Sequence, residues 1–268
     1  MSLISPQQLR ERLAGAGLLI LDARLLEQYE AGHIPGARNL DVYDYLVEST
    51  DPAGLEEMRA YLAQLFTSAG VGGDEEVVLY DETTGMLAAR GVWFLEYLGH
   101  PRVRQLDGGF QAWRAIGGAV SRDVPAAPRP AALAVRPRPD VLATSDYVAA
   151  RLGRPDVLIL DIRSEGEHRG NQKADCCPRA GRIPGSLWLE WGRLIDPEGR
   201  LLGGEQAPRL LADAGITPEK EIIVYCHRGA RAANTFLALR ELGFPRVRNF
   251  IGSWHEWSRR PDLPADCG

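Results

Sequence analysis

One cysteine of this chain stands in a sequence that favours ionisation of its thiol. It opens a short basic segment, Cys226-His227-Arg228-Gly229-Ala230-Arg231. The segment follows an apolar run and precedes an amphipathic one, so we expect a strand, a tight turn and the first turn of a helix. Unpaired amides at a helix N-terminus and nearby cations lower the pKa of a thiol from its usual value of about 8.5. Cys226 is therefore predicted to be a thiolate nucleophile.

The loop after Cys226 has the composition of an anion-binding turn. Gly229 can adopt a positive φ, which lets the chain curl around one centre. The amides of Arg228, Gly229, Ala230 and Arg231 would then surround an anion, and His227, Arg228 and Arg231 would add positive charge. The alternative is a cysteine that only fills space in a core. A packing cysteine does not require three basic residues and a glycine, so we favour the nucleophile.

Short motifs occur twice in the chain, in the same order. This indicates an internal duplication of roughly 120 residues. The paired segments are 19–24 and 158–163, 33–36 and 182–185, 77–80 and 222–225, 101–104 and 245–248, and Gly108 with Trp113 against Gly252 with Trp257.

A proline-rich stretch separates the two copies. Residues 124–140 contain prolines at positions 125, 128, 130, 137 and 139, a composition typical of a semi-rigid spacer. We therefore predict an N-terminal domain over residues 1–123, a linker over 124–140 and a C-terminal domain over 141–268.

Each copy has the pattern of an α/β domain. The runs 19–21, 77–80, 158–160 and 222–225 are apolar without alternation, as in strands buried on both faces. Amphipathic stretches lie between them, so we predict a parallel sheet flanked by helices on both faces. Ligands of such sheets bind beyond the carboxyl ends of the strands, and Cys226 lies at such an end.

Together these motifs resemble the rhodanese homology domain over nearly the whole chain. The resemblance rests on Asp-x-Arg, the Ile-Pro-Gly turn, a cysteine followed by x-x-Gly-x-Arg, and a glycine shortly before a tryptophan. Two copies with the cysteine only in the second are similar to the two-domain thiosulfate and mercaptopyruvate sulfurtransferases. The resemblance implies that Cys226 carries sulfur as a persulfide, with no metal and no organic cofactor.

The first copy has Asp81 at the position of Cys226. A carboxylate cannot hold sulfane sulfur, and it would repel an anionic donor. We therefore expect the N-terminal domain to be catalytically silent, as in the family of tandem enzymes that the chain resembles.

The resemblance also narrows the sulfur donor to a small anion. Family enzymes that use mercaptopyruvate carry a small, hydroxyl-bearing loop, whereas thiosulfate, a compact dianion, suits a basic loop. We therefore favour thiosulfate, with cyanide or a thiol as acceptor. Glu167 stands where the family has one donor-binding arginine, while Arg169 matches a second one of the mercaptopyruvate enzymes, which keeps that donor as an alternative. We expect Arg231 and Arg169 to hold the anionic end of the donor.

Two other functions fit a rhodanese-like cysteine loop less well. Dual-specificity phosphatases of related fold place five residues between cysteine and arginine, whereas four separate Cys226 from Arg231, which is too tight for phosphate. A non-catalytic binding module is also possible, since some rhodanese domains have lost activity. The retained cysteine of the second copy favours catalysis over both alternatives.

The composition of the chain indicates its partners and its cellular compartment. Apolar residues make up 45% and charged residues 25% of the chain, and the net charge is −5, which argues against nucleic acid as a partner. No apolar run is long enough for a membrane span, and the first residues lack the apolar core of a signal peptide. We expect a cytoplasmic protein, in which the four cysteines stay reduced. Pairing of two domains within one chain leaves little need for oligomerisation, so we expect a monomer.

Several other residues have an architectural interpretation. We expect the pairs Asp22–Arg24 and Asp161–Arg163 to be structural rather than acid–base groups, because the pair also occurs in the silent copy. Cys176 and Cys177 lack a second cysteine pair or a histidine cluster at metal-ligand spacing, so we expect free thiols in a long surface loop. Cys267, next to the end of the chain, is expected to be exposed.

Overall fold

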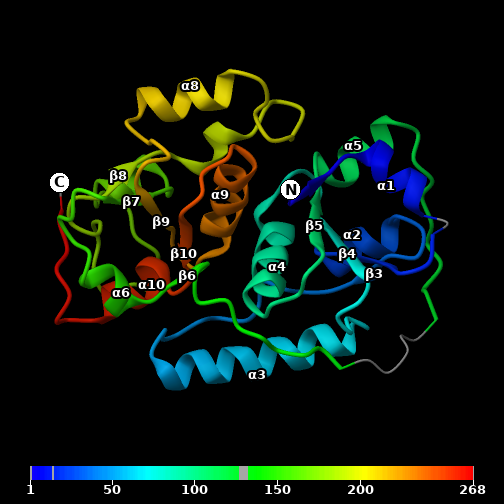
Figure 1. The fold of residues 1–268 in the computed structure, drawn as a ribbon, viewed down its shortest axis with the longest axis horizontal. Coiled ribbons are helices and arrows are strands. Elements are labelled where there is room, and N and C mark those ends of the chain that lie inside the picture. Colours follow the sequence, from blue (N-terminus) through cyan, green and yellow to red (C-terminus); the bar gives the residue numbers. More distant parts are fainter. Residues whose placement is uncertain (1, 14, 127–131, 268) are drawn as a thin grey trace. The chain divides into compact units, whose positions relative to one another are not determined.

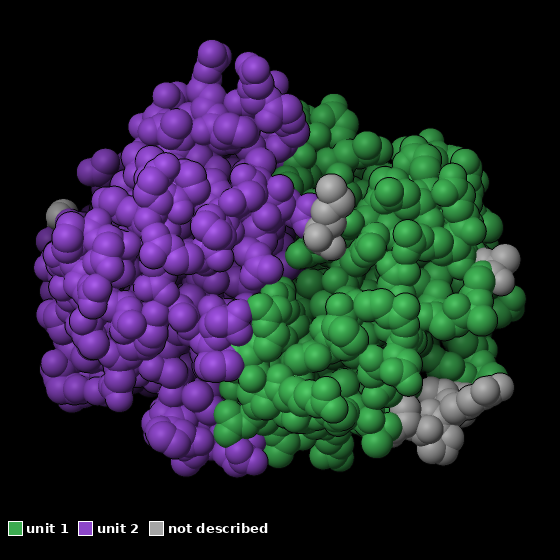
Figure 2. Space-filling view, viewed as in Figure 1, with its two compact units in different colours: residues 1–45, 57–138, 195–201 green, residues 46–56, 139–194, 202–268 purple. Residues whose placement is uncertain are grey.

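The computed structural model describes residues 2–13, 15–126 and 132–267 of the chain. These residues form two compact units (Figure 2). The first unit comprises the described residues within 1–45, 57–138 and 195–201. The second comprises the described residues within 46–56, 139–194 and 202–268. Residues 127–131 of the predicted linker lie outside the described residues. The predicted boundaries at residues 123 and 141 stay a prediction.

The sheet of the first unit is parallel throughout, with the strand order β1-β5-β4-β2-β3; β3, β4 and β5 are labelled in Figure 1. Its strands are β1 (Leu3–Ile4), β2 (Leu18–Asp22), β3 (Arg38–Asn39), β4 (Glu76–Tyr80) and β5 (Val103–Leu106). The helices in this part of the sequence are α1 (Pro6–Arg12), α2 (Leu26–Ala31), α3 (Pro52–Ser68), α4 (Met86–Tyr97) and α5 (Gly109–Ala115).

The second unit repeats this topology, with the parallel order β6-β10-β9-β7-β8. Its strands are β6 (Leu142–Ala143), β7 (Val157–Asp161), β8 (Leu187–Trp188), β9 (Glu221–Tyr225) and β10 (Val247–Phe250). Its helices are α6 (Ser145–Ala149), α7 (Glu165–His168), the 3₁₀ turn η1 (Trp191–Leu194), α8 (Gln206–Asp213), α9 (Ala230–Glu241) and α10 (Ser253–Arg259). The duplication inferred from the sequence is therefore present in the fold.

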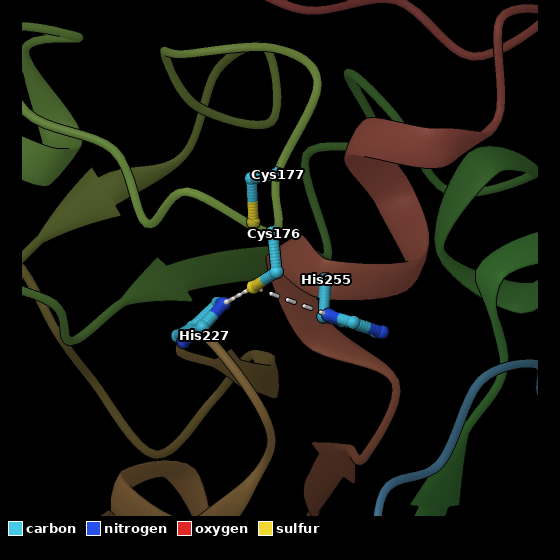
Figure 3. A group of neighbouring side chains, drawn as sticks. All are labelled: Cys176, Cys177, His227 and His255. Atoms are coloured by element: carbon cyan, nitrogen blue, oxygen red, sulfur yellow. Dashed lines mark hydrogen bonds between the residues drawn. The ribbon is translucent and has the colours of Figure 1, made fainter.

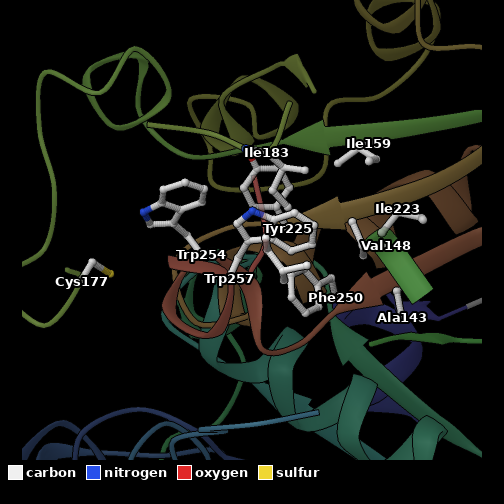
Figure 4. Packing of buried hydrophobic residues seen from close by; sticks show 11 residues of the cluster. Ala143, Val148, Ile159, Cys177, Ile183, Ile223, Tyr225, Phe250, Trp254 and Trp257 are labelled. Carbon is white, nitrogen blue, oxygen red and sulfur yellow. The ribbon is translucent and has the colours of Figure 1, made fainter. Parts of the chain in front are cut away.

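Strand β9 is buried on both of its faces, as its apolar sequence predicts. Ile223 and Tyr225 belong to a core cluster with residues of α6 and α10 such as Val148 and Trp257 (Figure 4). Ile222 and Val224 are also fully buried and point to the opposite face, where α9 packs along β9 and β10. Helices thus cover both faces of this sheet, which confirms the predicted fold class.

The Asp-x-Arg motif forms a buried ion pair at the end of β7. The Asp161 carboxylate accepts hydrogen bonds from Arg163 at 2.7 Å and from the Tyr225 hydroxyl at 2.8 Å. Arg163 also donates to the carbonyl of Gly181 at 2.8 Å, which fixes the following loop. Asp22, Arg24 and Tyr80 make the same arrangement in the first unit. The structural role predicted for this motif is confirmed.

A helix that crosses a membrane must be long and apolar. The longest among the described residues, α3, has 17 residues. Within the part of the chain that the structure describes, no helix combines the length and the apolar character that crossing a membrane requires.

Candidate active site

Cys226 lies at the carboxyl end of β9, between the strand and helix α9. Its side chain is buried, with 2% of the residue's surface exposed. The chain turns at Gly229, which caps α9 with φ 79° in the left-handed region. The Gly229 amide donates a hydrogen bond to Cys226 Sγ at 3.1 Å. This contact stabilises negative charge on Cys226 Sγ, as in a thiolate.

Gly229 cannot be replaced without disturbing the loop. A Cβ at this position would stand 2.5 Å from Ile251 Cδ1 and 2.6 Å from its carbonyl oxygen. The positive φ alone disfavours other residues. Both constraints explain why a glycine ends this turn, as the sequence predicts.

A serine that the sequence analysis did not single out also contacts Cys226. The Ser253 hydroxyl accepts a hydrogen bond from the Cys226 amide at 3.0 Å, donates one to the Phe250 carbonyl at 2.7 Å, and lies 3.9 Å from Cys226 Sγ. Among the described residues, Ser253 is the non-glycine residue with a positive φ, 53°. Backbone strain of this kind often accompanies a functional site.

The internal repeat contains a signal that could have identified Ser253. Gly252-Ser253 corresponds to Gly108-Gly109 of the first copy, and Gly109 adopts φ 56°. The two units thus share a backbone that suits glycine. Only the copy with the cysteine has a hydroxyl there, next to the sulfur.

The positive charge of the loop is more compensated than the sequence suggests. Arg231 makes a bidentate ion pair with Glu167, at 2.8 and 2.9 Å. Glu167, which stands where the family has an arginine, therefore neutralises the charge of Arg231. Burial, followed by the charge of Arg228, lowers the pKa of His227 to about 4. The expectation that His227 adds positive charge is therefore wrong at neutral pH, because desolvation disfavours the imidazolium. Arg228 Nη2 lies 3.8 Å from Cys176 Sγ.

Arg169 does not join this group through its observed contacts. It ends helix α7 and donates a hydrogen bond to Glu165 at 2.8 Å, on the same helix. Its side chain is 60% exposed. Ala230, by contrast, is buried at the first position of α9. The donor-binding roles predicted for residues 227–231 and for Arg169 stay predictions.

Asp81 is the counterpart of Cys226 in the first unit. Its carboxylate accepts hydrogen bonds from amides of the segment that follows it. Its Oδ1 accepts a hydrogen bond from the Glu82 amide at 2.8 Å, and its Oδ2 accepts one from the Leu87 amide at 3.0 Å. Burial raises the pKa of this carboxyl group. The loop before α4 is also one residue longer than the loop before α9, and its cap, Gly85, has φ −94° rather than a positive φ.

Cys176 and Cys177 lie in a different environment from the one predicted. Both are free thiols, but Cys177 is buried and Cys176 is half-buried. Cys176 Sγ lies 3.3 Å from His227 Nε2 and 3.9 Å from His255 Nδ1 (Figure 3). The expected surface position is therefore wrong, because the loop folds onto two histidines that the sequence places far away. Cys267 is exposed, as predicted.

Comparison with known proteins identifies the family. The pattern of the rhodanese-like domain matches residues 5–116 and again residues 144–260. The chain belongs to the rhodanese family. Its two matches correspond to the two copies found in the sequence, and only the second rhodanese domain has the cysteine.

Relatives with similar sequences span almost the whole rhodanese chain. It is 36% identical to a thiosulfate sulfurtransferase of Azotobacter vinelandii, over 98% of this chain and 96% of the relative. It is 35% identical to a thiosulfate sulfurtransferase of Pseudomonas aeruginosa, with the same coverage. A crystal structure of a probable thiosulfate sulfurtransferase matches with a TM-score of 0.75 and 35% identity, over 94% of this chain and 98% of that one.

Proposed function

We propose that this rhodanese is a thiosulfate sulfurtransferase that carries sulfane sulfur as a persulfide on Cys226. The observation that carries the proposal is the Cys226 sulfur at the strand–helix junction, with the Gly229 amide donating to it at 3.1 Å. The names of the relatives that match nearly the whole chain support the same activity.

The reaction divides into two steps at one sulfur. The Cys226 thiolate attacks the outer sulfur of thiosulfate, the bond between the two thiosulfate sulfurs breaks, and sulfite leaves with the electron pair. Cyanide, or a thiol in the cell, then attacks the outer sulfur of the persulfide and restores the thiolate. Covalent catalysis of this kind predicts ping-pong kinetics. Each step conserves charge and requires neither a redox partner nor a cofactor.

The chain's own groups stabilise the charge that moves between these sulfurs. The Gly229 amide is already directed at Cys226 Sγ, so little reorganisation is needed when negative charge develops there. Ser253 holds the Cys226 backbone through its amide. Arg228 and Arg231 attract the dianionic donor, with Arg231 oriented by Glu167.

Thiosulfate is the better supported of the two donors. The case for mercaptopyruvate rests on Arg169, and that side chain is largely exposed and paired with Glu165. The loop itself is basic rather than small and hydroxyl-bearing. We expect kcat/KM with cyanide as acceptor to be higher for thiosulfate than for mercaptopyruvate, and the reverse order would assign the chain to the second donor.

The persulfide is tested by intact-mass measurement after incubation with thiosulfate. We expect the chain to gain the mass of one sulfur atom, the gain to disappear in Cys226→Ser, and the gain to persist in Cys267→Ser, which alters an exposed thiol. A gain that persists in Cys226→Ser would contradict the proposal. Turnover of an aryl phosphate would favour the phosphatase, and neither activity would favour a binding module.

The proposal extends to the cellular compartment, the oligomeric state and the partners of the enzyme. Four free thiols fit a reducing compartment, and we propose the cytoplasm. We also propose a monomer without a nucleic-acid or membrane partner. Sedimentation of the purified chain tests the oligomeric state.

A further inference from the structure

Four potential metal ligands converge next to the loop that follows Cys226. They are Cys176 and Cys177 from the loop between α7 and β8, His227 from the loop after β9, and His255 from α10 (Figure 3). Their ligand atoms all lie within 4.8 Å of one another. Figure 3 shows the Cys176 sulfur between the two imidazoles. All four residues belong to the second unit.

The spacing of these atoms suits a tetrahedral ion. In a zinc site with Zn–S of about 2.3 Å and Zn–N of about 2.1 Å, a sulfur and a nitrogen ligand stand about 3.6 Å apart. The two distances from Cys176 Sγ, 3.3 Å to His227 and 3.9 Å to His255, fall on either side of that value. The contacts of Cys176 with the two histidines thus have the spacing of tetrahedral ligands, and all four ligand atoms lie within 4.8 Å of one another.

The backbone around the two cysteines is fixed by hydrogen bonds. The Cys177 amide donates to the Ala174 carbonyl at 2.9 Å, which closes a turn. Lys173 donates to the Cys177 carbonyl at 3.1 Å, and Arg259 donates to the Cys176 carbonyl. These contacts use backbone groups of the two cysteines, while the two sulfurs lie within 4.8 Å of the histidine ligand nitrogens.

His255 has a partner that orients its ring in the way that metal-binding histidines are oriented. Its Nε2 lies 3.0 Å from Glu48 Oε2, which leaves Nδ1 directed at the Cys176 sulfur. A carboxylate on the far nitrogen fixes the tautomer of a ligating histidine and raises its basicity. The His255 side chain is only 2% exposed, so its orientation is determined by packing as well.

We propose that Cys176, Cys177, His227 and His255 form a binding site for a thiophilic ion, with Zn²⁺ as the ion they suit best. Two thiolates and two imidazoles are a common zinc ligand set in proteins. Two thiolates balance the charge of the ion, while Arg228 and Glu48 at the margin balance each other. Since His227 follows Cys226 directly, the ion would lie beside the sulfur-carrying loop. The sequence prediction of no metal rested on the lack of a second cysteine pair or a histidine cluster at ligand spacing, whereas His227 and His255 come from segments that are distant along the chain.

The proposal is tested by titrating the reduced full-length protein with Co²⁺ and then displacing it with Zn²⁺. We expect one ion per chain, with the visible absorption of tetrahedral Co²⁺ and a near-ultraviolet band from thiolate coordination. Binding should release protons, because both thiols must ionise. An octahedral spectrum, or no binding at ion concentrations equal to the protein, would overturn the proposal.

Variants separate this site from the other thiols. We expect Cys176→Ser to weaken Zn²⁺ binding at least tenfold and to reduce the thiolate band by about half. Glu48→Gln, which changes an exposed carboxylate and leaves every ligand in place, should weaken binding by about 10–100-fold.

Cys226→Ser and Cys267→Ser serve as matched controls that should bind as the unaltered chain does. Loss of binding in Cys226→Ser, or unchanged binding in both Cys176→Ser and Glu48→Gln, would overturn the proposal. Circular dichroism of each variant identifies any loss of binding that results from misfolding.

Discussion

At the scale of single residues, the site depends on a few contacts between a sulfur and its nearest donors. Cys226 has the Gly229 amide at its sulfur and the Ser253 hydroxyl at its own amide. The Cys226 sulfur is buried, so the strength of each contact is increased by the low local polarity. Its activity should therefore respond sharply to changes that alter one hydrogen bond.

Ser253 provides the first test, because two substitutions separate its hydroxyl from its strained backbone. Both Ser253→Ala and Ser253→Gly remove the acceptor of the Cys226 amide, so we expect kcat/KM for thiosulfate to fall in both. Glycine tolerates the left-handed φ, so Ser253→Gly should be about 1 kcal/mol more stable than Ser253→Ala. Thermal unfolding and steady-state kinetics measure the two effects. Equal stabilities would show that the backbone at this position relaxes.

The ion pair of Arg231 with Glu167 provides a second test. Arg231→Ala leaves the Glu167 carboxylate partly buried without its partner and close to the donor. We expect KM for thiosulfate to rise about tenfold or more. The double variant Arg231→Ala with Glu167→Gln removes both charges, so its KM should rise less. If the single and double variants had the same KM as the unaltered chain, Arg231 would have no role in donor binding.

At the scale of elements, the turn between β9 and α9 is what positions the sulfur. Gly229→Ala introduces a Cβ 2.5 Å from Ile251 at a φ of 79°. We expect a loss of sulfur transfer together with a loss of stability beyond the roughly 1 kcal/mol that a left-handed alanine costs. The readouts are the rate of thiocyanate formation and the thermal unfolding temperature.

Gly243→Ala, just past the other end of α9, is the matched control. It has φ 86° but no atom within 4 Å of an added Cβ, so it should lose only the conformational cost and keep full activity. Equal effects of the two substitutions would mean that the contact with Ile251 is unimportant.

The buried pair at the end of β7 predicts how stability depends on pH. Burial alone would raise the pKa of Asp161, but the hydrogen bonds from His168 and Arg163 outweigh it and lower the pKa below its usual value. Its stabilising contribution is then complete above the pKa of an unfolded aspartate, about 3.9, and is lost as pH falls through the lower pKa of the folded state. Asp161→Asn leaves Arg163 buried without its counter-charge, so we expect a loss of about 3–5 kcal/mol at pH 7.

Urea unfolding at several pH values measures this dependence. The difference between the unaltered chain and Asp161→Asn should stay constant from pH 7 to about pH 5 and shrink below about pH 4. A difference that grew as the pH fell would reverse the sign of the proposed shift.

At the scale of the whole molecule, duplication has produced two copies of one fold with different chemistry at the same place. The first unit has the same strand order and the same buried Asp–Arg pair as the second, and Gly36 and Gly185 of the two Ile-Pro-Gly turns both have a positive φ. What differs is the residue after the central strand and the length of the loop that follows it. Asp81 satisfies the neighbouring amides with its own carboxylate.

Introducing a cysteine into the first unit should not create a second sulfur carrier. In Asp81→Cys the loop before α4 remains one residue longer, and Gly85 does not adopt the left-handed conformation of Gly229. We expect one sulfur per chain after treatment with thiosulfate, as in the unaltered chain. Intact-mass measurement of Asp81→Cys tests this, with Asp81→Cys/Cys226→Ser as the control that should carry none. Two sulfurs per chain would show that the cysteine alone is sufficient.

The sequence by itself determined the duplication, the parallel α/β architecture and the position of Cys226 between a strand and a helix. These features depend on the order and spacing of residues along one stretch of chain, and the duplication made them visible twice. The same local reasoning gave the roles of Gly229 and of the Asp-x-Arg motif, since their partners lie a few residues away or in a neighbouring strand.

Only the tertiary structure decided the electrostatics of the site and the environment of the other thiols. Glu167 neutralises Arg231 from 64 residues away, and Cys176 meets His227 across 51 residues. Burial lowers the pKa of His227, and burial is a property of packing that no local pattern records. Contacts between distant segments depend on how several loops converge at one end of a sheet, so they could not be read from spacing along the chain.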